Sequence, residues 1–266
     1  MKLEVLVATM GQESCLLAEQ MNIKGAAVLA NQCDRWDYAE QKDVRMLSTA
    51  TRGVGINRNF ALQLSKADIL LFADDDVRYY DGALDGVVKA FEQFPQADVI
   101  FFGLDMTKDG KVFEKRRNKV RRVHIWNALR YGTARMAVRR SAVMEKRLSF
   151  STLFGGGCIY GSGEDTVFIA DCLRAGLKAR SHDLVLGTCA KDSSSWFSGC
   201  NEKYLYDRGA MVACVFPRLK HLMKYHFARK TAQKYGVPMK KVLRHMNRGI
   251  RGFKTHTPWQ EERYEA

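Results

Sequence analysis

The chain has 266 residues, a hydrophobic content of 46% and a formal net charge of +14. This length fits one large domain or a domain with an appendage, and no apolar segment is long enough to cross a bilayer or to form a signal peptide. Seven scattered cysteines, never spaced as C-x-x-C, argue against a disulfide framework and against structural zinc, so we expect a cytosolic protein with a globular core.

Apolar periodicity in the first third of the chain predicts alternating strands and helices. Their order is β-α-β-β-α-β, which indicates a doubly wound, mainly parallel α/β sheet. The expected strands are 3–9, 25–31, 44–48 and 69–74, and the expected helices are 14–21 and 56–66.

The strand 69–74 ends in three consecutive carboxylates, Asp74, Asp75 and Asp76. Its continuous apolar run predicts burial on both faces of the sheet, and ligands of open α/β sheets bind beyond the carboxyl ends of the strands. With a side-chain period of two, Asp74 and Asp76 are expected to face one ion while Asp75 points elsewhere. Carboxylate oxygens at this spacing suit Mg²⁺ or Mn²⁺. The alternative is an acidic turn that only ends the strand.

The second part of the chain predicts further elements and a glycine-rich loop. The segment 108–122 is dense in Lys and Arg without apolar spacing, so we expect a solvated hairpin or loop there. Glycines at 155–157, 161 and 163 precede a helix that begins at Glu164 and Asp165. The other expected elements are helices 81–94 and 141–146 and strands 97–103, 135–139 and 183–188.

Three motifs follow one another along the chain: Gly53-Val-Gly-Ile-Asn-Arg-Asn59, Phe72-Ala-Asp-Asp-Asp76 and Gly163-Glu-Asp-Thr-Val-Phe168. Together they resemble the pattern of the family 2 glycosyltransferases of GT-A fold, over roughly residues 3 to 190. The resemblance implies a Rossmann-like, mainly parallel sheet flanked by helices. It also implies transfer of a sugar, with inversion, from a nucleotide-diphosphate donor such as a UDP-sugar to a hydroxyl of a saccharide acceptor.

The resemblance further implies where donor and metal bind. A divalent ion, Mn²⁺ or Mg²⁺, would stabilise the diphosphate that leaves. The second strand of the family usually ends on an acid that reads the base, whereas this one ends on Asn31 and Gln32, with Asp34 two positions later. The expected metal ligands are Asp76, Asp74 and His182, and the expected donor-binding residues are Thr9, Asn31, Asp34, Gly55, Arg58, Asp74 and Asp75.

Glu164 and Asp165 are the expected catalytic acids, with Asp165 as the general base that takes the proton of the acceptor hydroxyl. An acid at a helix start is also stabilised by the helix dipole, and Ser162 offers an N-cap. Capping explains the acids but not the glycine-rich approach, which leaves room for a substrate, so the catalytic interpretation is favoured. The segments 192–197, with Trp196, and 203–208 are candidates for an acceptor-side wall or lid, or for core and loop.

Residues 210–260 contain no Asp or Glu, and their apolar residues recur at helical spacing. We expect domain boundaries at 1–215 for the catalytic domain and 216–266 for a basic helical extension. A cationic amphipathic helix suits an anionic membrane surface, and the second extension helix is the better candidate. That location would suit a lipid-linked acceptor, as in the synthesis of a bacterial surface polysaccharide. The alternatives are packing on the catalytic domain or nucleic-acid binding.

Two other functions remain open from the sequence. A sugar nucleotidyltransferase also uses paired acids and a metal ion on an α/β sheet, but its phosphate loop normally lies nearer the N-terminus than Gly53. A basic RNA- or DNA-binding protein fits the net charge. Against it, the acids at Asp74 to Asp76 would repel phosphates without a metal ion.

Overall fold

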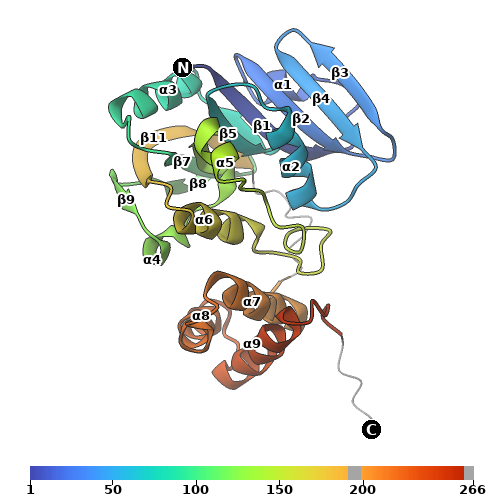
Figure 1. Ribbon diagram of the computed structural model, residues 1–266, viewed down its shortest axis with the longest axis vertical. Coiled ribbons are helices and arrows are strands. Elements are labelled where there is room, and N and C mark those ends of the chain that lie inside the picture. Colours follow the sequence, from blue (N-terminus) through green and yellow to red (C-terminus); the bar gives the residue numbers. More distant parts are fainter. Residues whose placement is uncertain (191–198, 261–266) are drawn as a thin grey trace.

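The computed structural model describes residues 1–190 and 199–260. An α/β unit holds the first part of the chain, and a group of three helices lies below it in Figure 1. Helix α6 lies between the sheet and these three helices (Figure 1). The α/β architecture with a helical C-terminal part confirms the fold class expected from the sequence.

Within the described residues, eleven strands form one mixed sheet. Nine of them follow the order β3-β4-β2-β1-β5-β10-β7-β11-β6, while β8 pairs with β7 and β9 with β11. The strands are β1 (Leu3–Met10), β2 (Ala26–Gln32), β3 (Asp37–Gln41), β4 (Val44–Thr49), β5 (Ile69–Asp74), β6 (Val77–Tyr79), β7 (Val99–Lys108), β8 (Lys111–Arg116), β9 (Arg121–Val123), β10 (Met136–Arg139) and β11 (Ala179–Ala190).

Helices cover both faces of the sheet, and their apolar residues form two cores with the strands. Side chains of alternate residues in β5 enter opposite cores, as expected for a strand buried on both faces. The helical elements are α1 (Leu17–Gln20), α2 (Val54–Leu64), α3 (Ala83–Gln93), α4 (Ile125–Ala128), η1 (Thr133–Arg135), α5 (Arg140–Glu145), α6 (Glu164–Arg174), α7 (Glu202–Val215), α8 (Lys220–Tyr235) and α9 (Met239–Phe253).

The register of the parallel strands brings the polar strand ends to one edge of the sheet. Ala8 pairs with Asp74, and Thr9 pairs with Asn31. Because β1, β2 and β5 run parallel, their carboxyl ends meet there, beside the start of α2. This edge is where the sequence places the ligand site.

Several elements differ from the sequence predictions. Strands β3 and β6 were missed, because β3 is an exposed, polar edge strand without apolar alternation and β6 has only three residues. The helix expected at 14–21 is a single turn. The strand expected at 183–188 is part of β11, which has 12 residues. The basic segment forms the strands β8 and β9, and both pair antiparallel with their neighbours.

The three C-terminal helices pack around close contacts between α7 and α9. Gly209 lies against the backbone of Met246, and a Cβ at Gly249 would overlap the carbonyl oxygen of Tyr206. The expected boundary at 216 falls between α7 and α8, inside this helical unit. The boundary followed charge composition, and the division of the chain into two domains stays a prediction.

The apolar stripe of α9 is buried in this helical unit. Val242, Met246 and Ile250 are at most 4% exposed, and the first two share a core with Val167 and Ala170 of α6. The packing alternative is therefore confirmed for α9, and the expectation that its stripe faces a membrane is wrong. In the described part of the chain, no helix has the length and apolar character that a membrane span requires.

Candidate active site

A cavity of 770 Å³ opens at the carboxyl edge of the parallel strands. It is bounded by the ends of β1 and β5, the glycine-rich loop, the start of α6 and α7, and Gly161 of that loop donates to Asp207 of α7 at 2.9 Å. It is lined by Ala8, Thr9, Met10, Gln32, Val54, Asn57, Arg58, Asp74, Asp75, Asp76, Gly156, Gly157, Cys158, Gly161, Ser162, Glu164, Ala190, Gly199, Asn201, Lys203, Tyr204 and Asp207.

Arg58 connects the three sequence motifs at this cavity. Its side chain is 4% exposed; Nη2 donates to Asp74 Oδ1 at 2.7 Å, and Nη1 donates to Asp165 Oδ1 at 2.8 Å. The same Nη1 donates to Glu164 Oε1 at 3.2 Å. Burial lowers the pKa of Arg58, but the carboxylates of Asp74, Asp165 and Glu164 outweigh this effect and keep the pKa above its usual value. The sequence suggested phosphate or base binding for Arg58, whereas the structure pairs it with acids.

The acids at the end of β5 all line the cavity. Asp75 accepts a hydrogen bond from Thr9 Oγ1 at 2.7 Å, and Asp76 accepts one from Cys189 Sγ at 3.3 Å. The three acids thus have different partners, and the expectation that Asp74 and Asp76 face one ion while Asp75 points elsewhere stays a prediction. Partial desolvation and the negative charge of Asp74 raise the pKa of Asp76 to about 6.

In the described residues, no group of three or more His, Cys, Asp or Glu is arranged to hold a metal ion. Mg²⁺ typically takes one or two protein carboxylates and completes its shell with water and substrate phosphates. One Arg58 faces three carboxylates, and Asp75 and Asp76 add to the negative charge. A cation beside Asp76 would relieve this excess.

The expected metal ligand His182 does not lie with the acids. Its Nε2 is 3.1 Å from Gln93 Oε1 of α3, and its ring packs near Phe94 and Phe102. In β11 it precedes Cys189, the residue that contacts Asp76, by seven positions. At a rise of about 3.3 Å per residue, this places His182 roughly 20 Å along the strand from the acids. Its assignment as a ligand is therefore wrong.

Three expected donor-binding residues have other surroundings in the structure. Asn31 is fully buried and exchanges hydrogen bonds with the backbone of Gln12. Asp34 is exposed and pairs with Arg52 at 2.9 Å. A Cβ at Gly55 would overlap the carbonyl oxygen of Ser151, so this glycine allows α2 to pack closely on the chain that precedes the glycine loop.

The structure adds residues that the motifs did not indicate. Gln32 and Asn57 line the cavity from β2 and α2, and Lys203, Tyr204 and Asp207 line it from α7. These last three belong to the segment 203–208, a candidate for an acceptor-side wall or lid, or for core and loop. Its role stays a prediction. Trp196, the other candidate, lies outside the described residues.

Glu164 and Asp165 begin α6 and face different surroundings. Ser162 does not cap this helix, because the N-cap is Gly163, with a φ of 113° and no side-chain cap.

The two acids differ in the cavities that they border. Asp165 Oδ1 accepts a hydrogen bond from Thr133 Oγ1 at 2.5 Å, and Asp165 lines a second cavity of 330 Å³ with Tyr131, Tyr204 and Arg208. Glu164 lines both cavities. Burial, then the charge of Asp165, raises the pKa of Glu164 to about 7, against the opposing effect of Arg58.

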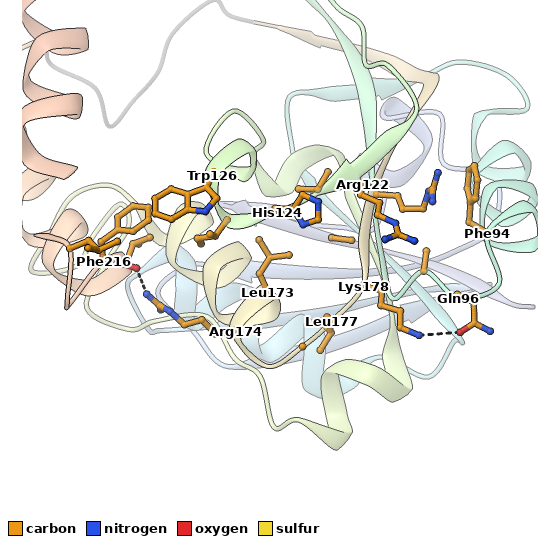
Figure 2. Close-up of a pocket in the computed structure, with 18 of the residues that line it drawn as sticks. Phe94, Gln96, Arg122, His124, Trp126, Leu173, Arg174, Leu177, Lys178 and Phe216 are labelled. Carbon is orange, nitrogen blue, oxygen red and sulfur yellow. Dashed lines mark hydrogen bonds between the residues drawn. The ribbon is translucent and has the colours of Figure 1, made fainter. Parts of the chain in front are cut away.

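A larger cavity of 1290 Å³ lies apart from the acids (Figure 2). It is lined by the end of α3 and the loop that follows it, by β9 and the start of α4, by the end of α6 and the start of β11, and by the α7–α8 connection. Figure 2 shows Trp126 beside Phe216, with His124 and Arg122 along the same wall. Volume alone would favour this cavity as the catalytic site, but no carboxylate lines it. The chemistry places the site at the acids.

Comparisons with known proteins identify the fold and a similar family. The crystal structure of S. aureus TarS 1-349 in complex with UDP-GlcNAc matches with a TM-score of 0.64 at 12% identity, covering 100% of this chain and 95% of that chain. The complex of the same protein with UDP matches with a TM-score of 0.62, with the same identity and coverage. A longer TarS structure has a TM-score of 0.57 at 14% identity, covering 80% of this chain and 39% of that chain. A search among curated proteins gives no match.

The fold is thus the GT-A fold, shared with TarS. Residues 28–151 match the model of glycosyl transferase family 2, and this region contains the first two motifs. Over these residues, just under half of the chain, the protein is similar to the family 2 glycosyltransferases. This similarity favours glycosyl transfer over the nucleotidyltransferase and nucleic-acid-binding alternatives.

The raised pKa of Glu164 predicts a pH-dependent stability. The unfolded chain releases this proton near pH 4.5 and the folded protein near pH 7, so the stability contributed by proton binding is full below 4.5 and is lost as the pH rises through 7. We expect Glu164→Gln to raise the free energy of unfolding at pH 8 by on the order of 2–3 kcal/mol, and to change it little at pH 4. Urea unfolding at both pH values measures this.

The matched control is Glu92→Gln on the exposed side of α3, which should leave the difference between the two pH values as in the wild type. Equal effects of the two substitutions at pH 8 would contradict the assignment of the titrating group to Glu164.

Proposed function

We propose that the protein transfers a sugar from a UDP-sugar to a hydroxyl of a saccharide or lipid-linked saccharide, in one inverting, metal-dependent step. The observation that carries this proposal is the contact of one buried cation, Arg58, with acids from both the end of β5 and the start of α6. Donor-side and acceptor-side acids are thereby held around one guanidinium, between the 770 Å³ and the 330 Å³ cavities.

The donor would occupy the 770 Å³ cavity. TarS, whose fold this chain shares, has been crystallised with UDP-GlcNAc and with UDP, which supports a uridine nucleotide here. Asp76 and Asp74 would hold the metal ion, and that ion would supply stabilisation of the negative charge that grows on the departing diphosphate. Thr9 fixes Asp75 beside them.

The acceptor would approach Asp165 from the 330 Å³ cavity. As the acceptor oxygen bonds to the anomeric carbon, the bond from that carbon to the diphosphate oxygen breaks, and Asp165 takes the hydroxyl proton. Attack from the face opposite the leaving group inverts the anomeric centre. Arg58 and Thr133 fix the orientation of the Asp165 carboxylate, and Tyr204 of α7 lines both cavities. The helical unit is therefore proposed to be part of the active site.

Contact with an anionic membrane surface at the cytoplasmic face is also proposed, through α8 and α4 instead of α9. Leu222 of α8 is 66% exposed and Trp126 of α4 is 63% exposed. Leu219, the N-cap of α8, and Tyr225 of α8 are exposed as well. Arg218 and Lys220 flank Leu219. Apolar side chains surrounded by cations suit the interface of an anionic bilayer.

The donor proposal predicts a metal-dependent nucleotide site. UDP with Mn²⁺ should raise the melting temperature of the wild type more than UDP alone, by about 2.7 kcal/mol of stabilisation at a hundredfold excess over the dissociation constant. Asp76→Ala should abolish the dependence on Mn²⁺, whereas Asp43→Ala, at an exposed position before β4, should keep it. A full Mn²⁺-dependent shift in Asp76→Ala would refute the metal assignment.

The general-base proposal predicts a selective loss of turnover. Asp165→Asn should lower kcat by on the order of 10²- to 10⁴-fold, because the amide cannot take the proton. The loss of kcat is measured as UDP release from a UDP-sugar, with a saccharide acceptor that supports wild-type turnover. The thermal shift that UDP induces should persist in Asp165→Asn. Asp171→Asn, further along α6 and paired with Arg174 at 3.0 Å, should remain active. Wild-type turnover by Asp165→Asn would exclude Asp165 as the base.

The membrane proposal predicts that Leu222→Asp weakens binding to vesicles rich in phosphatidylglycerol by about tenfold, since one apolar side chain no longer inserts and a negative charge is added. Co-sedimentation measures the bound fraction, with phosphatidylcholine vesicles as the neutral reference. Leu16→Asp makes the same change at a residue of the α/β unit that is 51% exposed, and should bind as the wild type does. Equal binding of all three proteins would exclude α8 as the contact.

A further inference from the structure

A strongly basic cavity of 690 Å³ lies between the end of β8, the β8–β9 connection and the segment that leads into η1. Seven of its ten lining residues are Lys or Arg, and one, Glu114, is acidic. This cavity is separate from the proposed donor cavity, since the two share no lining residue. The proposed reaction assigns it no role.

Only part of this positive charge is balanced. Arg116 pairs with Glu114 at 3.0 Å, and Arg117 pairs with Asp105. In residues 1–190 and 199–260, no carboxylate forms an ion pair with the cavity's Arg121, Arg130 or Arg135. Cations gathered without counter-charge repel one another, so an anion in the cavity would be attracted to them.

Arg135 is the most informative of these cations because it is buried. The residue is 8% exposed, its guanidinium lies 5.3 Å from the centre of the Tyr131 ring, and Nη2 donates to the Arg130 carbonyl oxygen at 2.7 Å. Burial, then the positive charge of Arg116, lowers the pKa of Arg135 to about 10. A guanidinium is normally buried with an acid, and here its contacts are a ring and a carbonyl group, while the charge of Glu114 offsets only part of the lowering of the pKa.

The basic cavity adjoins the proposed acceptor side. Thr133, the first residue of η1, donates to Asp165, and Arg135 is the last residue of the same short helix. Tyr131 lines both the basic cavity and the cavity that contains Asp165. An acceptor whose hydroxyl reaches Asp165 can therefore extend past Tyr131 into the basic cavity.

We propose that the acceptor is anionic and that one of its oxyanions, a phosphate or a carboxylate, binds among Arg121, Arg130 and Arg135. This inference rests on the proposed function and specifies its substrate class. Guanidinium groups bind both oxyanions through paired hydrogen bonds, so the two sources share one recognition chemistry. A polynucleotide is the competing occupant. Arg135 on the inner wall favours a single oxyanion that enters the cavity over a backbone that passes across the surface.

The test uses the full chain and four small probes, namely glycerol 3-phosphate, galacturonic acid, and their neutral counterparts glycerol and galactose. Calorimetric titration gives each dissociation constant for the wild type, for the double variant Arg121→Gln/Arg130→Gln, and for Arg229→Gln. The exposed Arg121 and Arg130 are replaced because Arg135 is buried and its loss would perturb folding. Arg229, exposed on α8, provides the matched change of charge.

We expect at least one anionic probe to bind the wild type about tenfold tighter than its neutral counterpart, and the double variant to lose this preference while Arg229→Gln keeps it. Preference for the phosphate or for the carboxylate identifies the oxyanion. Equal binding of anionic and neutral probes, or equal loss in both variants, would overturn the inference. So would an RNA oligonucleotide that binds through these arginines while neither small anion binds.

The Mn²⁺-dependent thermal shift with UDP separates this inference from the proposed function. A UDP shift that persists in the double variant, with oxyanion binding lost, supports both. A UDP shift in the wild type without any oxyanion preference overturns the acceptor inference alone. Absence of the UDP shift in the wild type contradicts the donor proposal itself, whatever the anionic probes do.

Discussion

The active-site region depends on one buried cation. Arg58 extends from α2 and contacts Asp74, Glu164 and Asp165, which are separated from one another by up to ninety-one positions in the sequence. If the guanidinium were removed, these carboxylates would face one another without compensation, which is costly in a buried site. Because three carboxylates meet one guanidinium, the cluster carries an excess of negative charge once Glu164 is ionised.

This cluster of Arg58 and its acids lies between two cavities. Asp74 to Asp76 and Glu164 line the larger of the two cavities beside it, and Asp165 lines the smaller one with Tyr204. Helix α7 borders both cavities, and it is joined to α9 through backbone contacts that only glycine at 209 and 249 permits. Helix α7 thus lines both cavities and is held in place by α9.

The basic residues behind the net charge of +14 are concentrated in two parts of the molecule. The amino-acid composition indicated the C-terminal extension as the first of these parts. There the apolar stripe of α9 packs in the helical unit, whereas α8 has exposed apolar and basic residues. A second concentration lies between β8 and η1, where Arg135 is buried without an acidic partner. The first location suits a surface, and the second suits a small charged group next to the acids of α6.

By itself the sequence determined the α/β class, the strand Ile69–Asp74, the helix that begins at Glu164 and the order of the three motifs. These features depend on the spacing of apolar residues and on helix-start residues, and both signals lie within short segments of the chain. Only the tertiary structure decided that Arg58 pairs with acids, that His182 lies far along β11, and that Asn31 and Gly55 serve packing. It also decided that α7 belongs to the helical unit and that η1 brings Arg135 close to Asp165. These features depend on which distant segments meet, and no local pattern of residues encodes the distance between them.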